Sequence, residues 1–337
     1  MFFSFFLLAL LALVFVGKVL GTLGLIGSST GAESGRRFEE KTVENPTADD
    51  KIAIIDVEGI ITSQPFNRNG RNMVEFIDDQ LKAAAKDAAV KAVILKVDSP
   101  GGEVMASDDI ARSLQDFQEK NHKPVIAAMG GLAASGGYYV SAPCQWIVAN
   151  ELTITGSIGV IMHGINYRGL MDKLGVQPQV FKSGRFKDMM SGSKKPEEVD
   201  PEEKQMIQDM IMETYGKFKT VVAEGRKRAE TKNQGKGRSL AKNWADFADG
   251  RVLTGTKAHD LGFVDELGNF EKAVESTKRI AGITGNARLI RYQEPFEFGS
   301  LFSLFGKTDT KSLKIDLGLD LPKLRAGIPY FLYTVSQ

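Results

Sequence analysis

The sequence predicts an α/β domain with a largely parallel sheet, preceded by an apolar N-terminal segment. Short apolar runs that resemble strands alternate along the chain with longer stretches that carry apolar side chains at helical spacing. This alternation is typical of parallel sheets in which each strand is connected to the next by a helix. With 337 residues, of which 42% are apolar and 25% charged, the chain is long enough to bury a large core.

The first strand and helix are predicted directly after residue 50. Residues 51–62 (KIAIIDVEGIIT) form an apolar run, broken at Gly59, that predicts a buried strand. Residues 72–88 then carry apolar side chains at helical spacing, namely Met73, Phe76, Ile77 and Leu81.

Two further strands follow, each ending in glycine-rich sequence. Residues 93–97 predict a buried strand that ends abruptly in Ser-Pro-Gly-Gly at 99–102, and a polar helix continues to about Lys120. Residues 124–131 (PVIAAMGG) predict a short strand. Residues 132–142 (LAASGGYYVSA) predict a turn that leads into a helix of small residues.

A long helix is predicted after residue 200. Residues 200–202 (Asp-Pro-Glu) provide the N-cap and the first-position proline expected at a helix start. An apolar stripe at helical spacing then predicts docking on a core or on a neighbour; it comprises Met206, Ile207, Met210, Ile211, Tyr215, Phe218, Val221 and Val222. The basic stretch 226–243 is expected to be a solvated loop.

The N-terminal segment predicts a membrane anchor. Residues 1–27 are apolar with Lys18 as their only charge, and they reach the roughly 20 residues needed to span a bilayer. A cleaved signal peptide is the alternative interpretation. Residues 28–50 are small and polar and predict a tether, which leaves 51–291 as the globular domain. The tail 292–337 carries few signals, and no structure is assigned to it.

Composition excludes several classes of function. The net charge of +1 gives no field that would attract nucleic acid. The single cysteine, Cys144, excludes an internal disulfide framework, and no zinc, haem or P-loop spacing is present. We therefore expect no cofactor, no metal and no nucleic-acid partner.

Two glycine-rich turns carry candidate chemistry. In residues 98–102 (DSPGG), paired glycines after a strand let backbone N–H groups face a cleft, where they suit a developing oxyanion. In residues 130–139 (GGLAASGGYY), Ser135 is the one hydroxyl before a helix start, among small residues that keep it accessible. Taken alone, the first segment is explained by an ordinary turn between a strand and a helix, and the second by an ordinary helix cap.

Two further segments complete the constellation. Residues 153–160 (TITGSIGV) form a glycine-punctuated apolar strand with a hydroxyl in its middle. Residues 181–189 (FKSGRFKDM) carry Lys182 and Lys187. A nucleophilic serine needs a base, which is usually histidine, but a lysine whose pKa is lowered by burial can serve instead.

The four segments together resemble the SppA-type signal peptide peptidases of the Clp-protease/crotonase superfamily. The resemblance covers about residues 50–290 and includes GRVL at 250–253 with LGFVD at 261–265. Its most specific motifs, at the intervals of that family, are SPGG, AASGGYY, TGSIGV and GRFKDM. The fold that the resemblance implies is α/β, a Clp/crotonase-like repeated β-β-α spiral, here with an N-terminal transmembrane helix.

The resemblance implies a Ser/Lys dyad. Ser135 matches the nucleophile and Lys187 the general base. Ser157 matches a serine that hydrogen-bonds the lysine amine, and Gly102 and Gly136 match the oxyanion donors.

The resemblance also implies a setting for this chemistry. The expected protein is an endopeptidase that degrades signal-peptide remnants and similar apolar peptides, in a homo-oligomeric ring whose dyad can be shared between protomers. It is a single-pass protein of the cytoplasmic membrane with its catalytic domain on the extracytoplasmic side. The positive-inside rule, applied to Lys18, Arg36 and Arg37, points to the opposite orientation, although acidic residues nearby leave little net charge.

Three alternatives stay open from the sequence. His163 lies 28 residues after Ser135, where it could be the base of a Clp-like Ser-His-Asp triad. A crotonase-like acyl-CoA enzyme uses the same fold, but an accessible serine would then be unexplained. An inactive membrane scaffold would not need both Ser135 and Lys187.

Overall fold

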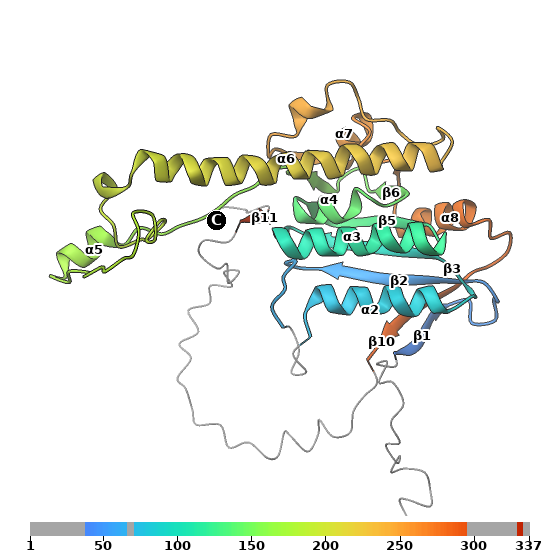
Figure 1. The fold of residues 1–337 in the computed structure, drawn as a ribbon. Coiled ribbons are helices and arrows are strands. Elements are labelled where there is room, and N and C mark those ends of the chain that lie inside the picture. The colour runs from blue at the N-terminus through green and yellow to red at the C-terminus, as the bar shows by residue number, and fades with distance from the viewer. Residues whose placement is uncertain (1–37, 66–70, 295–328, 333–337) are drawn as a thin grey trace, which may run out of the picture. The chain divides into compact units, whose positions relative to one another are not determined.

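The structure is a computed structural model that describes residues 38–65, 71–294 and 329–332 (Figure 1). In chain order its elements are β1 (Glu39–Glu44), β2 (Lys51–Glu58), α2 (Met73–Lys86), β3 (Val90–Ser99), β4 (Gly101–Glu103), α3 (Val104–Asn121), β5 (Val125–Ala134), α4 (Gly136–Ser141), β6 (Trp146–Ala149), β7 (Ile154–Gly156), α5 (Arg168–Lys173), η1 (Pro196–Glu198), α6 (Pro201–Lys232), η2 (Trp244–Phe247), β8 (Val252–Thr254), α7 (Gly255–Asp260), β9 (Glu266–Leu267), α8 (Phe270–Ala281), β10 (Arg288–Gln293) and β11 (Tyr330–Leu332).

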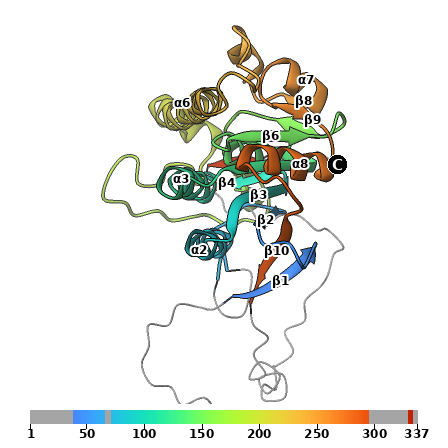
Figure 2. The same cartoon turned by 90° about the vertical axis from the view of Figure 1, so that its right-hand side faces the viewer.

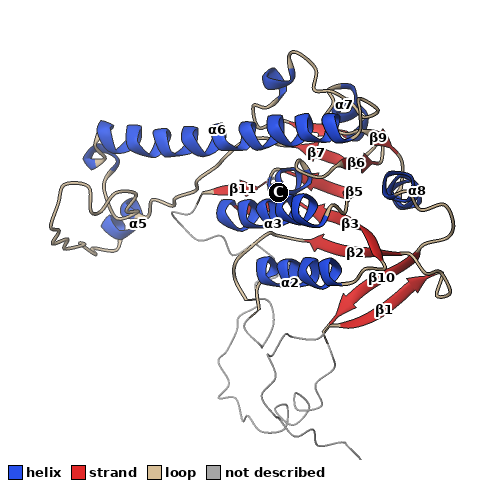
Figure 3. Ribbon diagram, turned by 45° about the vertical axis from the view of Figure 1, so that its right-hand side comes forward, coloured by secondary structure: helices blue, strands red, loops and turns tan. Residues whose placement is uncertain are grey.

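The predicted α/β domain with a largely parallel sheet is confirmed. Within the described residues the main sheet has nine strands, in the order β1-β10-β2-β3-β5-β6-β9, with β7 beside β5 and β8 beside β7 (Figure 3). Only the pairs β1–β10 and β7–β8 of this sheet are antiparallel. Strands β4 and β11 form a separate antiparallel pair.

Helices cover both faces of the sheet, with α2 and α3 on one face and α8 on the other (Figure 2). Successive side chains of β2 therefore enter different cores: Ile55 packs in the cluster that holds Leu81 of α2, whereas Ile54 packs in the cluster that holds Ala273 of α8. Because both faces are covered, the central strands read as continuous apolar runs instead of alternating ones.

The predicted helix starts are confirmed by their capping bonds. Asn72 accepts a hydrogen bond from the N–H of Glu75 at 3.0 Å at the start of α2. Asp200 accepts one from the N–H of Glu202 at 2.9 Å at the start of α6. These bonds satisfy N–H groups that have no partner within the helix.

The expected tether contains a strand. Residues 39–44 form β1, which pairs with β10 at the edge of the sheet. All six residues are exposed, so the strand has no buried face and leaves no apolar periodicity in the sequence. The predicted anchor 1–27 lies outside the described residues, and among the residues that are described no helix is both long and apolar enough to cross a membrane.

The apolar side chains of helix α6 are buried only toward its C-terminal end. Its C-terminal part packs on the body of the domain with Phe218 and Val222 buried, whereas Met210 and Met212 nearer its start are exposed. The expected solvated loop at 226–243 is wrong at its start, because residues 226–232 belong to this helix and Arg226 is buried in an ion pair with Asp265.

Residues 162–200, which include α5, form a projecting segment that we call the arm. Figures 1 and 3 show α5 beyond the strands, near the start of α6. No residue of α5 is buried. The arm is therefore held to the body through α6 and through the backbone around Ile161, which pairs with β11.

Candidate active site

Ser135 lies at the junction between β5 and α4, in a conformation that non-glycine residues rarely adopt. Its φ of 54° and ψ of −116° place it outside the favoured regions. The residue is only 1% exposed, so the accessibility expected from its small neighbours is wrong for this structure. Its N–H donates to the carbonyl of Gly156 at 2.8 Å, and its carbonyl accepts from the N–H of Tyr139 at 2.8 Å. Such strained residues cluster at functional sites, where surrounding bonds maintain them.

The residue after the serine has to be glycine because other groups approach it closely. A Cβ added to Gly136 would lie 2.7 Å from Oγ of Ser107 and 3.0 Å from the amide nitrogen of Gly102. The first distance is shorter than real Cβ contacts, and the second is tight enough that the Gly102 backbone would have to shift. The turn before α3 and the turn before α4 are thus brought into direct contact beside Ser135.

Two backbone amides face the same space. The N–H of Ile61 donates to the carbonyl of Gly101 at 2.9 Å, and the carbonyl of Ile61 accepts from the N–H of Glu103 at 2.8 Å. The polar groups of Gly102 therefore lie on the opposite edge of β4. The amide of Gly136 opens α4, where the first N–H groups have no partner within the helix. Neighbouring amides of this kind can stabilise a negatively charged oxygen.

Ser157 lies on the segment next to the nucleophile candidate. It follows β7, which pairs with the end of β5, and it also has a positive φ, 50°. Its N–H donates to the carbonyl of Arg251 at 2.7 Å. Ser157 lines an open groove of about 610 Å³, which is also lined by Ile161 and by Met212 and Tyr215 of α6.

Within the described residues of one chain, no hydrogen bond or ion pair joins the side chain of Lys187 to these groups. It is exposed in the arm, which projects from the body that holds β5 and α4 (Figure 1). Its neighbour Asp188 is engaged by Lys182 at 2.9 Å and Lys194 at 3.1 Å, and the hydrogen bond from Lys182 contributes most to keeping the pKa of Asp188 low. The structure therefore brings Ser135, Gly102, Gly136 and Ser157 together without the predicted base.

In the part of the chain that the structure describes, no hydrogen bond or ion pair joins a histidine side chain to this group of residues. His163 is exposed at the start of the arm, and no hydrogen bond or ion pair of its side chain is found within the described residues. His122 ends α3 in the left-handed conformation. His259 lies on α7 beside Arg238, and burial lowers its pKa.

An aromatic pocket beside the site was not predicted. Phe331 of β11 is fully buried against Tyr139 of α4 and Phe218 of α6, with ring centroids 4.7 and 4.6 Å away. Tyr139 is fixed because its hydroxyl donates to Asp108 at 2.6 Å, and burial raises its pKa. The only signal in the sequence is the β-prone run YFLYTV at 330–335.

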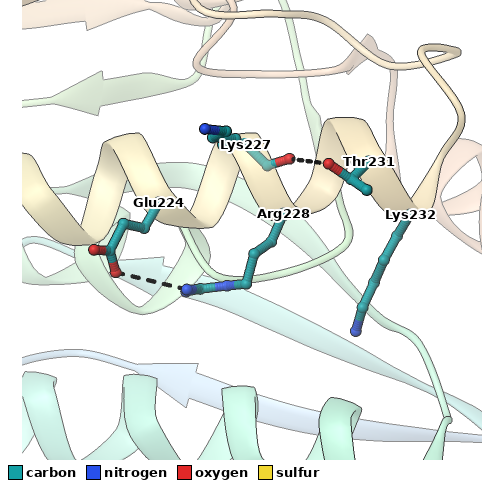
Figure 4. A pocket seen from close by; sticks show the side chains of 5 residues that line it. All are labelled: Glu224, Lys227, Arg228, Thr231 and Lys232. Carbon is teal, nitrogen blue, oxygen red and sulfur yellow. Dashed lines mark hydrogen bonds and ion pairs between the residues drawn. The ribbon is translucent and has the colours of Figure 1, made fainter.

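A second hollow lies on the other end of α6 and lacks these features. It is lined by Glu224, Lys227, Arg228, Thr231 and Lys232, and Figure 4 shows the 3.6 Å ion pair between Glu224 and Arg228 along one side of the helix. Pairs of this type stabilise an exposed helix face. Neither a nucleophile nor strained backbone occurs there, so we do not assign it a catalytic role.

Comparison with known proteins identifies the family. The profile described as Peptidase family S49 matches residues 117–284, a range that includes Ser135, Ser157 and Lys187. A candidate signal peptide peptidase SppA of Enterococcus faecium is 40% identical over 75% of this chain and 70% of its own length. The chain belongs to peptidase family S49. It is an SppA-type serine peptidase.

Other relatives agree with this assignment. A candidate protease of Synechocystis is 39% identical over 69% of this chain and 75% of its own length. Protease 4 of Haemophilus influenzae is 34% identical over 72% of this S49 chain, which corresponds to only 36% of that longer protein. The acyl-CoA enzyme considered from the sequence finds no support among these relatives.

Proposed function

We propose that this S49 peptidase cleaves peptides with a Ser135/Lys187 dyad. The observation that carries the proposal is the strained backbone of Ser135 beside the amides of Gly102 and Gly136. In this assignment the two amides form the oxyanion hole, and Ser157 hydrogen-bonds the lysine amine. A turn that presents a hydroxyl next to two backbone amides matches the needs of acyl transfer.

The reaction begins when the neutral amine of Lys187 accepts the proton of the Ser135 hydroxyl. The Oγ attacks the peptide carbonyl, and the amides of Gly102 and Gly136 stabilise the oxyanion. The lysine ammonium then protonates the leaving amine as the C–N bond breaks. Water, deprotonated by the lysine, hydrolyses the acyl-enzyme and regenerates the serine.

We propose that Lys187 reaches Ser135 of a neighbouring protomer in a homo-oligomeric ring. The exposed position of Lys187 on the arm supports this, because no hydrogen bond joins the lysine to its own Ser135 within the described residues. The arm also exposes large apolar side chains, among them Ile165 at 81% and Phe181 at 92%. A second copy that covers these side chains would complete the site and remove apolar surface from water.

The substrates in this proposal are signal-peptide remnants and other apolar peptides. The apolar sequence of residues 1–27 supports a single-pass anchor in the cytoplasmic membrane. The extracytoplasmic side of the peptidase domain is taken from the resemblance to SppA-type peptidases, not from the charges around this segment. The printed name of the Enterococcus relative supports this substrate class. The order β3-β4-α3, in which two strands precede a helix, supports a Clp/crotonase-like repeated β-β-α spiral.

Labelling with a fluorophosphonate, read by mass spectrometry, tests the nucleophile. We expect the label on Ser135 in the wild-type protein and in Ser113→Ala, a control on α3 whose hydroxyl bonds Asp78. Ser135→Ala should lose both labelling and peptide hydrolysis and keep its melting temperature. Hydrolysis near the wild-type rate in Ser135→Ala would exclude Ser135 as the nucleophile.

A further inference from the structure

Strand β5 carries a bulge at residues 130–132, shortly before Ser135. We propose that this bulge sets the position of the Ser135 hydroxyl, and that Asp98 and Thr153 are the positioning residues that hold it. The inference rests on the proposed role of Ser135. It adds two side chains that act on the nucleophile through the backbone and take no part in the chemical step.

The bulge is seen as a change of register between β3 and β5. Val97 lies opposite Met129 and Ser99 lies opposite Ala133, so two residue steps on β3 face four on β5. Two extra residues are therefore accommodated between Met129 and Ala133. Bulges bend a strand and are frequent next to active sites, where they redirect a side chain.

The bulge is also the point at which β5 changes its neighbour. Before it, residues 126–128 pair with β6, and after it, residues 132–134 pair with β7. The pairing with β7 continues into the bond from the Ser135 N–H to the Gly156 carbonyl at 2.8 Å. The conformation of the bulge thus determines where the end of β5 meets β7, and with it where Ser135 lies.

Hydrogen bonds to two side chains hold the bulge. The N–H of Leu132 donates to Oδ1 of Asp98 on β3 at 3.1 Å. The hydroxyl of Thr153, a residue that is 1% exposed, donates to the carbonyl of Gly130 at 2.8 Å. The same hydroxyl accepts from the N–H of Asn150 at 3.0 Å, so it also fixes the turn that leads from β6 to β7.

Side-chain packing contributes little to the shape of the bulge. Gly131 is exposed, and a Cβ added there would meet nothing within 4 Å. A hollow of about 340 Å³ lies against Gly130 and Gly131 and is also lined by Thr153 and Phe270. Because two of the three bulge residues have no side chain that could pack, the bonds to Asp98 and Thr153 decide the geometry.

A displacement of the bulge should act on the chemical step. Ser135 has to be aligned with its base and with the oxyanion donors, and a misplacement of about 1 Å caused by a remote change can lower a rate about 100-fold. Neither Asp98 nor Thr153 lines the groove beside Ser157, so the affinity for substrate should change little. The inference therefore predicts a loss in kcat with little change in KM.

Paired substitutions that remove or keep each hydrogen bond test the inference. Thr153→Val keeps the shape of the side chain and loses the hydroxyl, whereas Thr153→Ser retains it. Asp98→Ala loses the acceptor, whereas Asp98→Asn retains an acceptor without the charge. Thr153→Val and Asp98→Ala should lower kcat and the rate of fluorophosphonate labelling by about tenfold or more, with KM within about twofold of wild type.

The conservative variants and a control complete the series. Thr153→Ser and Asp98→Asn should stay within about threefold of the wild-type rates. Glu58→Ala removes an exposed carboxylate from the position opposite Asp98 on β2 and should change neither rate. Wild-type kcat in Thr153→Val and Asp98→Ala would overturn the inference. An Asp98→Asn protein as slow as Asp98→Ala would also contradict it, because the charge and not the hydrogen bond would then matter.

Hydrogen–deuterium exchange, read by mass spectrometry, separates a displaced bulge from a loss of folding. In Thr153→Val the segment 130–139 should exchange faster, while α8 keeps its wild-type exchange. Faster exchange throughout the domain would indicate general destabilisation and contradict a positioning role. Failure of the Ser135 assignment gives a different result, because Ser135→Ala then keeps its activity, and the exchange of residues 130–139 still reports whether Thr153 holds the bulge.

Discussion

The N–H of Ser135 donates to the carbonyl of Gly156 at 2.8 Å, across the pairing of β5 with β7. This bond connects two positions of positive φ, because Gly156 has a φ of 75°, and Ser157, which directly follows it, also has a positive φ. The strain at Ser135 is therefore maintained by the neighbouring strand as well as by α4. A substitution at the end of β5 or of β7 should therefore alter the backbone conformation of Ser135.

Gly136→Ala should abolish most activity while the chain stays folded. The new methyl group would lie 2.7 Å from Oγ of Ser107 and 3.0 Å from the Gly102 amide nitrogen, so the two proposed oxyanion donors must move apart. Loss of one such donor typically lowers kcat by about 10²–10³-fold. The crowding should cost about 1–3 kcal/mol of stability. Steady-state kinetics and urea unfolding measure the two effects.

Gly131→Ala is the matched control for this change. Gly131 lies on β5, the strand that leads to Ser135 and Gly136, and a Cβ added there meets nothing within 4 Å. Its kinetics should stay within about twofold of wild type, since surface substitutions are usually near neutral. Equal kcat values for the Gly136→Ala and Gly131→Ala proteins would contradict the oxyanion assignment.

Replacement of Lys187 tests the base. Lys187→Ala and Lys187→Arg should both be inactive, because arginine keeps its proton at any working pH and cannot accept one from serine. The wild-type rate should rise with pH, since only the neutral amine can act as the base. Peptide hydrolysis measured between pH 6 and pH 10 gives the profile.

Two controls accompany that profile. Lys173→Ala removes another lysine from the arm, at the end of α5, and should stay active. His163→Ala should also keep its activity. An inactive His163→Ala protein together with an active Lys187→Ala protein would select the Clp-like triad instead of the dyad.

The sequence predicts this fold and part of the site for a physical reason. Buried parallel strands appear as continuous apolar runs, and the turns after β3, β5 and β7 follow those runs directly. Because carboxyl ends of neighbouring parallel strands meet at one edge of a sheet, Gly102, Ser135 and Ser157 come together once the strands are identified.

The remaining features depend on partners that are distant in the sequence. The pairing of β11 with β4 joins segments more than 200 residues apart, and no local pattern specifies which edge a short strand will join. Arg226 looks like one more residue of a basic stretch, yet it pairs with Asp265, 39 residues away. The position of Lys187 on a projecting arm cannot be obtained from its motif, because the motif specifies neighbours in sequence only.

Removal of the buried partner Arg226 should destabilise the domain strongly. Both side chains of the Arg226–Asp265 pair are 1% exposed, and Asp265 also accepts from the N–H of Ile147 at 2.9 Å. Arg226→Met leaves the carboxylate buried without its counter-ion, which typically costs about 3–5 kcal/mol. Urea unfolding measures this. Lys120→Ala, which breaks an exposed pair with Asp116, should cost less than about 1 kcal/mol, and similar losses for both variants would contradict the argument.

The last prediction is that two inactive proteins restore activity when they assemble together. If Ser135 meets Lys187 of its neighbour, rings built only from Ser135→Ala or only from Lys187→Ala subunits are inactive. In rings that contain both kinds of subunit, some boundaries join an intact serine to an intact lysine. In a random equal mixture about one boundary in four is intact, because two independent choices must both be right.

The experiment requires subunits that exchange completely. Detergent-solubilised Ser135→Ala and Lys187→Ala proteins are unfolded together, reassembled, and checked for mixed rings by native mass spectrometry. A mixture of Ser135→Ala with Ser135→Ala/Lys187→Ala is the control, since it holds no intact serine and should stay inactive. Recovery of about a quarter of wild-type activity supports a site shared between protomers. Mixed rings without activity would show that the serine and its base belong to the same chain, because every subunit then carries one lesion.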